Sequence, residues 1–140
     1  MTDEAEQDAP YEMVEHTADV AIRVHGRDLS ELFITAARAL FALMTAHADN
    51  TDTERTITLE AIDAEALLVD WLNALLWLQE TDGLTFTRFS LETLTPTRLI
   101  ARVSGGPTTG KTLVVKAATF HNLHIERTER GVEALIVFDI

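Results

Sequence analysis

The sequence contains no cysteine and few basic residues. Without cysteine, a chain of 140 residues can form neither disulfides nor thiolate metal sites. Only 11 Lys and Arg stand against 23 Asp and Glu, which gives a formal net charge of −12. Proteins that bind a phosphate backbone do so with clustered basic side chains, so direct binding to nucleic acid is not expected. No apolar run reaches the length of a membrane span, so no membrane association is expected either.

The composition that remains is typical of one globular domain. Apolar residues make up 46% and charged residues 24%, and the length is sufficient to bury a core. Residues 1–10 are acidic and are predicted to form a disordered tail, with the folded domain over residues 11–140. The N-terminus is the reverse of a positively charged signal region, so we expect a cytoplasmic protein.

Two helices are predicted from apolar periodicity. Asp28 and Glu31 have the spacing of a capping box, and apolar residues recur at helical spacing over residues 29–44. The second helix begins after Asp63 and ends at the turn Asp82-Gly83. Its apolar band is wide and includes Trp77, which indicates deep burial or a surface covered by a partner.

The rest of the chain is predicted to be strands. Alternating apolar residues mark them, with hairpin turns at Thr95-Pro96 and Arg130-Gly131 and a further strand over residues 112–120. The predicted order is ββαβαβββββ, with the first strand ending before His16. A long final run of strands favours an α+β fold, a single domain with two helices packed on a largely antiparallel sheet.

The segment "GGPTTGKT", Gly105 to Thr112, matches the phosphate loop G-x-x-x-x-G-K-T. That loop requires a helix that begins at its lysine, so that backbone N–H groups meet the phosphates. The residues after Lys111 are instead "TLVVKAAT", which are rich in β-branched side chains and predict a strand. We therefore interpret Gly105, Gly106, Pro107 and Gly110 as a hairpin turn.

Carboxylates at the two ends of the predicted fold suggest a metal site. Asp139 is followed by Ile140 and its α-carboxylate, and Asp19 lies in "HTAD" at the start of a predicted strand. Three such groups would form a hard oxygen cage suited to calcium, magnesium or manganese. The alternative is an aspartate in a turn and a solvated terminus. His16 is close enough in sequence to orient Asp19 through a hydrogen bond.

These motifs together resemble the archease family. The resemblance rests on "EHTADVAI", "LSELFITAARALFALM", "LLVDWLNALLWL", "VKAATFHNLHIE" and "VFDI", in family order from Tyr11 to Ile140. One departure is Ala21, where the family commonly has glycine. Ala21 therefore raises the question of whether this position needs a positive φ.

The resemblance implies an accessory protein, not an enzyme, that activates an RtcB-type RNA ligase. Such proteins promote guanylylation of the ligase and its multiple turnover during tRNA splicing and RNA repair, without holding the RNA themselves. By the same resemblance, Asp19, Asp139 and Ile140 would bind a divalent metal ion, with calcium as the first expectation. Lys116 in "VKAAT" matches a lysine that the family uses functionally, although on the fold alone it could be a surface strand lysine.

Two alternatives of other classes remain open from the sequence. The first is a stand-alone nucleotide-binding enzyme that uses Lys111 and Asp139. The second is a chaperone-like binding module whose apolar surface near Trp77 engages other proteins. The nucleotide-binding enzyme predicts tight nucleotide binding that Lys111→Ala abolishes, whereas the chaperone-like module predicts client binding that is indifferent to Asp19 and Asp139.

Overall fold

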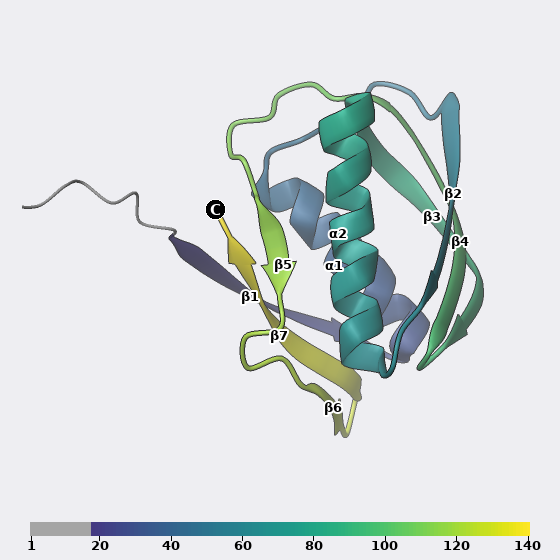
Figure 1. Cartoon of the computed structure of the whole chain (residues 1–140), viewed down its shortest axis with the longest axis vertical. Helices are drawn as coiled ribbons and strands as arrows, with labels where there is room; N and C mark the ends of the chain where they lie inside the picture. Colours follow the sequence, from purple (N-terminus) through teal and green to yellow (C-terminus); the bar gives the residue numbers. More distant parts are fainter. Residues whose placement is uncertain (1–17) are drawn as a thin grey trace, which may run out of the picture.

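The computed structural model describes residues 18–140, which fold as one α+β domain with two helices and two antiparallel sheets (Figure 1). The elements follow one another as βαβαβββββ, so the predicted fold class is confirmed. The additional strand predicted before His16 and the predicted tail over residues 1–10 lie outside the described residues. Among residues 18–140, no helix has the length and apolar character needed to cross a membrane.

Each sheet is organised around one central strand. In the first sheet, β7 pairs with β1, β5 and β6; in the second, β4 lies between β2 and β3. The strands of the first sheet are β1 (Asp19–Gly26), β5 (Ala117–Thr119), β6 (Ile125–Thr128) and β7 (Gly131–Asp139). Those of the second are β2 (Thr53–Glu60), β3 (Leu84–Thr95) and β4 (Arg98–Pro107).

The helices begin and end at the residues that the sequence indicates. The side chain of Asp28 caps α1 (Leu29–Leu43) by accepting from Glu31 N–H, and Asp63 caps α2 (Ala64–Asp82) in the same way. The carboxylate of Glu31 accepts from the N–H of Arg27, one residue before the cap, so the capping box is displaced by one position. Gly83 ends α2 in the left-handed conformation, with φ of 68°.

The core lies between the helices and the two sheets. The predicted apolar face of α1 is buried, and Phe33, Leu40 and Met44 are fully enclosed. Trp71 is the largest fully buried side chain, and its Nε1–H donates to the carbonyl oxygen of Phe33 at 3.0 Å. Burial of each large apolar side chain contributes roughly 1.5–3 kcal/mol. Trp77, in contrast, is 64% exposed on the outer side of α2.

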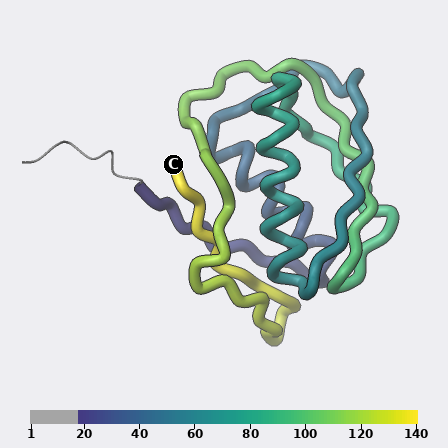
Figure 2. Tube along the Cα trace, viewed as in Figure 1, coloured from purple at the N-terminus to yellow at the C-terminus, as the bar shows by residue number. Residues whose placement is uncertain are grey.

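The connection between β4 and β5 departs from the prediction. Gly105, Gly106 and Pro107 are the last residues of β4 and form no hairpin turn, and residues 110–116 have no regular secondary structure. The chain here crosses from the second sheet to the first at one end of the molecule (Figure 2). Its backbone bonds to the segment after α1: Thr109 exchanges two hydrogen bonds with His47, and Thr112 N–H donates to Met44.

The strand predicted over residues 112–120 is therefore reduced to the three residues of β5. Alternation over this stretch is real, since Val115 is buried and Val114 is 58% exposed. An alternating pattern of apolar residues indicates which side chains face the core, but a strand also needs a neighbouring strand to pair with. Residues 112–115 have no such neighbour because the chain is crossing between sheets, and Lys116 makes the first hydrogen bond to β7, from its N–H to the carbonyl oxygen of Asp139.

Candidate metal centre

Asp19 and Asp139 lie opposite each other at one end of the first sheet. Asp19 is the first residue of β1 and Asp139 the last of β7, and the antiparallel register pairs their Cα atoms. Side chains of directly opposite residues leave the sheet on the same face, with Cβ atoms about 4.5–5.5 Å apart. That face is the outer one, because Val24 on the alternate face of β1 is buried in the core. The two carboxylates therefore share one surface.

Ile140 is held beside this pair by its main chain and its side chain. Its N–H donates to the carbonyl oxygen of Ala18 at 3.0 Å, which continues the β1–β7 ladder by one residue. Its partly buried side chain packs on the core. This is expected because successive side chains of a strand point to opposite faces, and the preceding Asp139 points outward. The main chain of Ile140 is thus fixed one residue beyond the two aspartates.

Lys116 lies beside β7 on the side opposite β1. Ala117 pairs with Asp139 in the β5–β7 register, and Lys116 N–H donates to the carbonyl oxygen of Asp139 at 2.8 Å. The side chain of Lys116 is exposed. In Figure 1 the C-terminus lies between the start of β1 and β5. Four predicted site residues, Asp19, Asp139, Ile140 and Lys116, therefore meet at this end; the fifth, His16, lies outside the described residues.

The donors at this end are oxygen atoms and carry negative charge. Among residues 18–140 neither aspartate forms an ion pair, and two adjacent carboxylates on one face repel each other unless a cation lies between them. Carboxylate oxygens are the ligands that calcium, magnesium and manganese prefer. Over the same residues, no group of three His, Asp or Glu side chains is placed to hold a metal. Further oxygens could come from the Ile140 carboxylate, from backbone carbonyls and from water.

Ala21 fits its place in β1 without strain. It pairs with Val137 in the β1–β7 register, and it is not among the residues with positive φ. The backbone therefore does not require glycine at this position. The departure from the family pattern leaves the strand that carries Asp19 intact.

Asn73 is a positioning residue that the sequence reasoning missed. Its Oδ1 accepts from Ala118 N–H at 2.8 Å and its Nδ2 donates to the Ala118 carbonyl at 3.2 Å, so one side chain fastens β5 to α2. Lys116 directly precedes β5, and its N–H bonds to the carbonyl oxygen of Asp139. The signal in the sequence was a polar, poor helix former inside the apolar run "DWLNALLW".

The "GGPTTGKT" segment does not have the geometry of a phosphate loop. No helix follows Lys111, and Gly110, with φ of 74°, lies in the irregular crossover. Gly105 is required for another reason: a Cβ there would collide with the backbone of Thr85 on the neighbouring strand β3. The absence of a following helix pattern had indicated that this is no phosphate loop, but the segment is the end of a closely packed strand and a crossover loop, and not the predicted hairpin turn.

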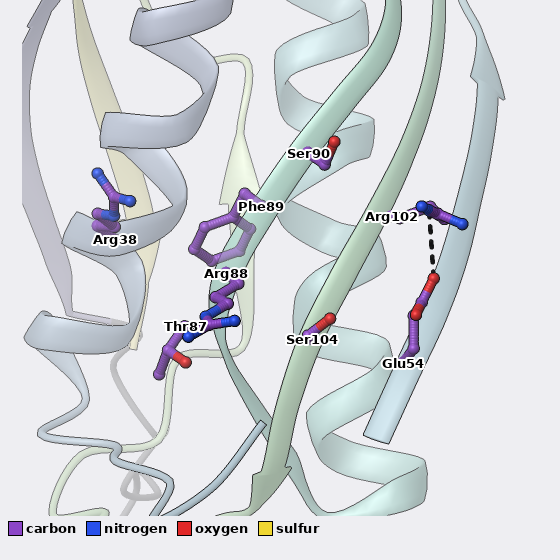
Figure 3. A pocket seen from close by; sticks show the side chains of 8 residues that line it. All are labelled: Arg38, Glu54, Thr87, Arg88, Phe89, Ser90, Arg102 and Ser104. Carbon is purple, nitrogen blue, oxygen red and sulfur yellow. Dashed lines mark ion pairs between the residues drawn. The ribbon is translucent and has the colours of Figure 1, made fainter. Parts of the chain in front are cut away.

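A basic pocket of about 390 Å³ lies at the second sheet, lined by residues of β2, β3 and β4 together with Arg38 of α1 (Figure 3). Arg102 lies between two carboxylates, 3.2 Å from Glu54 and 3.0 Å from Glu92. Arg38 and Arg88 also line the pocket, and all three arginines are exposed. This pocket belongs to the other sheet and contains none of the predicted site residues.

Comparison with known proteins agrees with the fold and with the motifs. Residues 11–140 match the model of the archease protein family (MTH1598/TM1083). The chain belongs to the archease family. The archease of Methanosarcina mazei is 34% identical, over 96% of this chain and 98% of that protein. The archease of Saccharolobus islandicus is 37% identical, over 93% and 98%.

Two solved structures share the fold. A crystal structure from Thermotoga maritima, described as an archease and possible chaperone, superposes with a TM-score of 0.69, covering 93% of this chain and 97% of that one at 23% identity. The solution structure of protein 1598 from Methanobacterium thermoautotrophicum gives a TM-score of 0.64, covering 91% and 96% at 29% identity. The two-helix, two-sheet architecture is therefore that of archeases.

Proposed function

We propose that this archease is a non-catalytic, cytoplasmic activator of an RtcB-type RNA ligase, acting through a divalent ion held by Asp19, Asp139 and the α-carboxylate of Ile140. The observation that supports the site most directly is the pairing of the two aspartates across β1 and β7. Membership of the archease family supports the role, because the resemblance to archeases implies it.

The residues at this end would bind and present the ion. Asp19 and Asp139 supply negative charge from one face, and Ile140 is anchored by its hydrogen bond to Ala18. Both aspartates are at least partly accessible, so an ion held there could reach a second protein. A divalent ion polarises phosphoryl oxygens and orients a triphosphate for attack. The exposed Lys116 would pair with a phosphate or an acidic group at that interface.

The charge of the protein supports a basic partner. At a formal net charge of −12, the protein would repel RNA directly but would be drawn to the positively charged surface that an RNA-binding enzyme presents. Complementary charge raises the rate of encounter. The protein would thus reach the ligase and not its substrate.

The test is multiple-turnover ligation by the cognate ligase with GTP, manganese and RNA ends in large excess. We expect the wild-type protein to raise the product from about one per ligase to many, and Asp19→Asn or Asp139→Asn to remove the gain. Glu126→Gln is the matched control, because Glu126 is an exposed carboxylate on β6 of the same sheet. No gain with the wild-type protein, or a full gain with both aspartate variants, would contradict the proposal.

A second measurement isolates the terminal carboxylate. Extending the chain past Ile140 by a few residues moves the α-carboxylate away, and calorimetric titration with calcium and manganese should then show weaker binding. The same extension at the N-terminus serves as control. Unchanged metal affinity in the C-terminally extended protein would remove Ile140 from the ligand set.

The chaperone-like alternative is favoured by one observation, the exposure of Trp77. It predicts that the protein suppresses aggregation of unrelated denatured proteins, and that Asp19→Asn and Asp139→Asn leave this activity unchanged. Loss of aggregation suppression in those variants would contradict it.

A further inference from the structure

Exposed apolar side chains gather where α2 lies beside residues 116–124. We call this surface the α2–β5 strip. Within residues 18–140, four large apolar side chains are strongly exposed, and three of them border the strip: Ile62 at 88%, Trp77 at 64% and Phe120 at 59%. Figure 1 shows α2 and β5 side by side, as the hydrogen bonds between Asn73 and Ala118 require.

The strip contains two hollows on either side of the Asn73–Ala118 contact. The larger, of about 710 Å³, is bordered by Ile62 and Phe120; the smaller, of about 230 Å³, is bordered by Trp77. Residues 64–80 of α2 run along both, and at 1.5 Å per residue they give the strip a length of about 24 Å. That length can accommodate an extended or helical segment of another chain.

The larger hollow is strongly acidic. Glu60, Asp63, Glu65 and Asp70 line it together with His124, and no Lys or Arg does. Within residues 18–140 none of these four carboxylates forms an ion pair. Asp63 caps α2 and Glu65 accepts from Ile125 N–H, but each keeps its negative charge. Exposed apolar groups next to carboxylates without ion pairs are complementary to a segment that carries both apolar and cationic side chains.

Other occupants are disfavoured by charge. Nucleic acids and anionic membrane surfaces would be repelled by the carboxylates. A second copy of this chain would bring its own net charge of −12 against the same surface. A cationic protein segment avoids this repulsion, and its Lys or Arg side chains can also stack on the exposed ring of Trp77.

The strip is continuous with the candidate metal centre. Lys116 and Ala117 line the smaller hollow beside Trp77, and Lys116 N–H bonds to the carbonyl of Asp139. A partner segment seated along the strip would therefore have its end next to the paired aspartates. Docking on the strip and presentation of an ion by the aspartates would then occur in the same complex.

We infer that the α2–β5 strip is the docking surface for a cationic segment with apolar anchors on the partner protein. The inference rests on the proposed function, because the partner is taken to be the RtcB-type ligase. Trp77 and Phe120 would act as anchors, since aromatic side chains dominate binding energy at interfaces. Asp70 would contribute through charge, so its effect should weaken with salt.

The experiment measures binding to the ligase separately from turnover. The protein is labelled with 5-fluorotryptophan, which gives only two ¹⁹F resonances because the chain contains two tryptophans. Adding unlabelled ligase should shift the resonance of the exposed Trp77 and leave that of the buried Trp71 in place. Trp71 thus reports in the same spectrum that the fold is unchanged.

Affinity is then compared among matched variants by titration. Trp77→Ala and Asp70→Lys should each raise Kd at least tenfold, with the Asp70→Lys effect shrinking as salt increases. The controls are Val114→Ala, an exposed apolar residue on the crossover, and Glu129→Lys in the β6–β7 turn; both should bind as the wild type does. Asp139→Asn should bind normally and yet fail to raise turnover.

The outcomes separate the two proposals. If the wild type binds and raises turnover but Trp77→Ala and Asp70→Lys bind equally well, the docking surface is wrong and the proposed function stands. If the Trp77 resonance shifts with the concentration of the protein itself, the strip binds a second copy and the inference is overturned. If the wild type neither binds nor raises turnover, both proposals fail.

Discussion

Asn73→Ala should loosen the attachment of β5 to α2. The variant removes two hydrogen bonds at once, the one from Ala118 N–H to Oδ1 and the one from Nδ2 to the Ala118 carbonyl. Ala118 is only 4% exposed, so water cannot readily replace both partners. The backbone of β5 would then retain hydrogen bonding to β7 alone.

The size of the effect follows from these contacts. Leaving a buried N–H without a partner costs about 1–3 kcal/mol, and the better helix propensity of alanine returns roughly 0.5 kcal/mol. The unfolding entropy of globular proteins is about 2.1 cal/mol/K per residue, which amounts to about 0.3 kcal/mol/K for a chain of this length. The net cost of about 0.5–2.5 kcal/mol should therefore lower the Tm by about 2–8 °C.

The assay is thermal unfolding by circular dichroism, together with amide hydrogen exchange at Ala118. Glu80→Ala is the control, because Glu80 is exposed on the same helix and should change stability by less than about 0.5 kcal/mol. Ala118 should lose protection in Asn73→Ala and keep it in Glu80→Ala. An Asn73→Ala protein with the Tm of the control and a protected Ala118 amide would refute the reasoning.

Three further predictions concern stability. Gly105→Ala should lower the free energy of unfolding by about 1–3 kcal/mol, because the added Cβ would collide with the backbone of β3. The control Lys111→Ala, in the exposed loop, should change it by less than about 0.5 kcal/mol. Urea unfolding measures both variants, and a Gly105→Ala protein as stable as the wild type would contradict the close packing of β4 on β3. The hydrogen bond from Arg27 N–H holds the pKa of Glu31 below its ordinary value of 4.5. The ionised Glu31 therefore stabilises the folded protein fully above pH 4.5, and this stabilisation is lost as the pH falls through the lowered pKa. Glu31→Gln should remove this part of the acid dependence in unfolding curves recorded as a function of pH, and an unchanged profile would argue against it. Trp71→Phe removes the buried hydrogen bond to α1 and should cost about 1–3 kcal/mol by thermal unfolding; a Tm equal to that of the wild type would show that the bond contributes nothing.

The helices were predictable because their signals are local. Asp28 and Asp63 cap the helices within three residues of sequence, and Gly83 ends α2 through its own backbone conformation. The hairpins turning after Thr95 and before Gly131 are local in the same sense, since each joins strands adjacent along the chain. Such features depend on neighbours that the sequence itself places side by side.

The division into two sheets was not predictable, because it depends on distant partners. Alternation of buried and exposed side chains over residues 112–116 shows which side chains face the core, but the backbone there bonds to Met44 and reaches a strand only at Lys116, whose N–H donates to Asp139 of β7. The same limit applied to the candidate site. The sequence proposed Asp19 and Asp139 by residue type and resemblance, and only the β1–β7 register brings them together. Asn73 was missed because its partner, Ala118, is 45 positions away.

The pairing of β1 with β7 also has a consequence for how the molecule folds. In the second sheet the β3–β4 hairpin needs only a short loop to close, and the most distant pair, Thr53 with Gly105, is much closer in sequence than Asp19 and Asp139. The first sheet must instead unite residues as far apart as Asp19 and Asp139, and contacts at such separation form slowly because a long loop has to be ordered first. The second sheet should therefore assemble early, and the two aspartates should meet only in the final step. A chain that has not completed folding would therefore lack the proposed ion site.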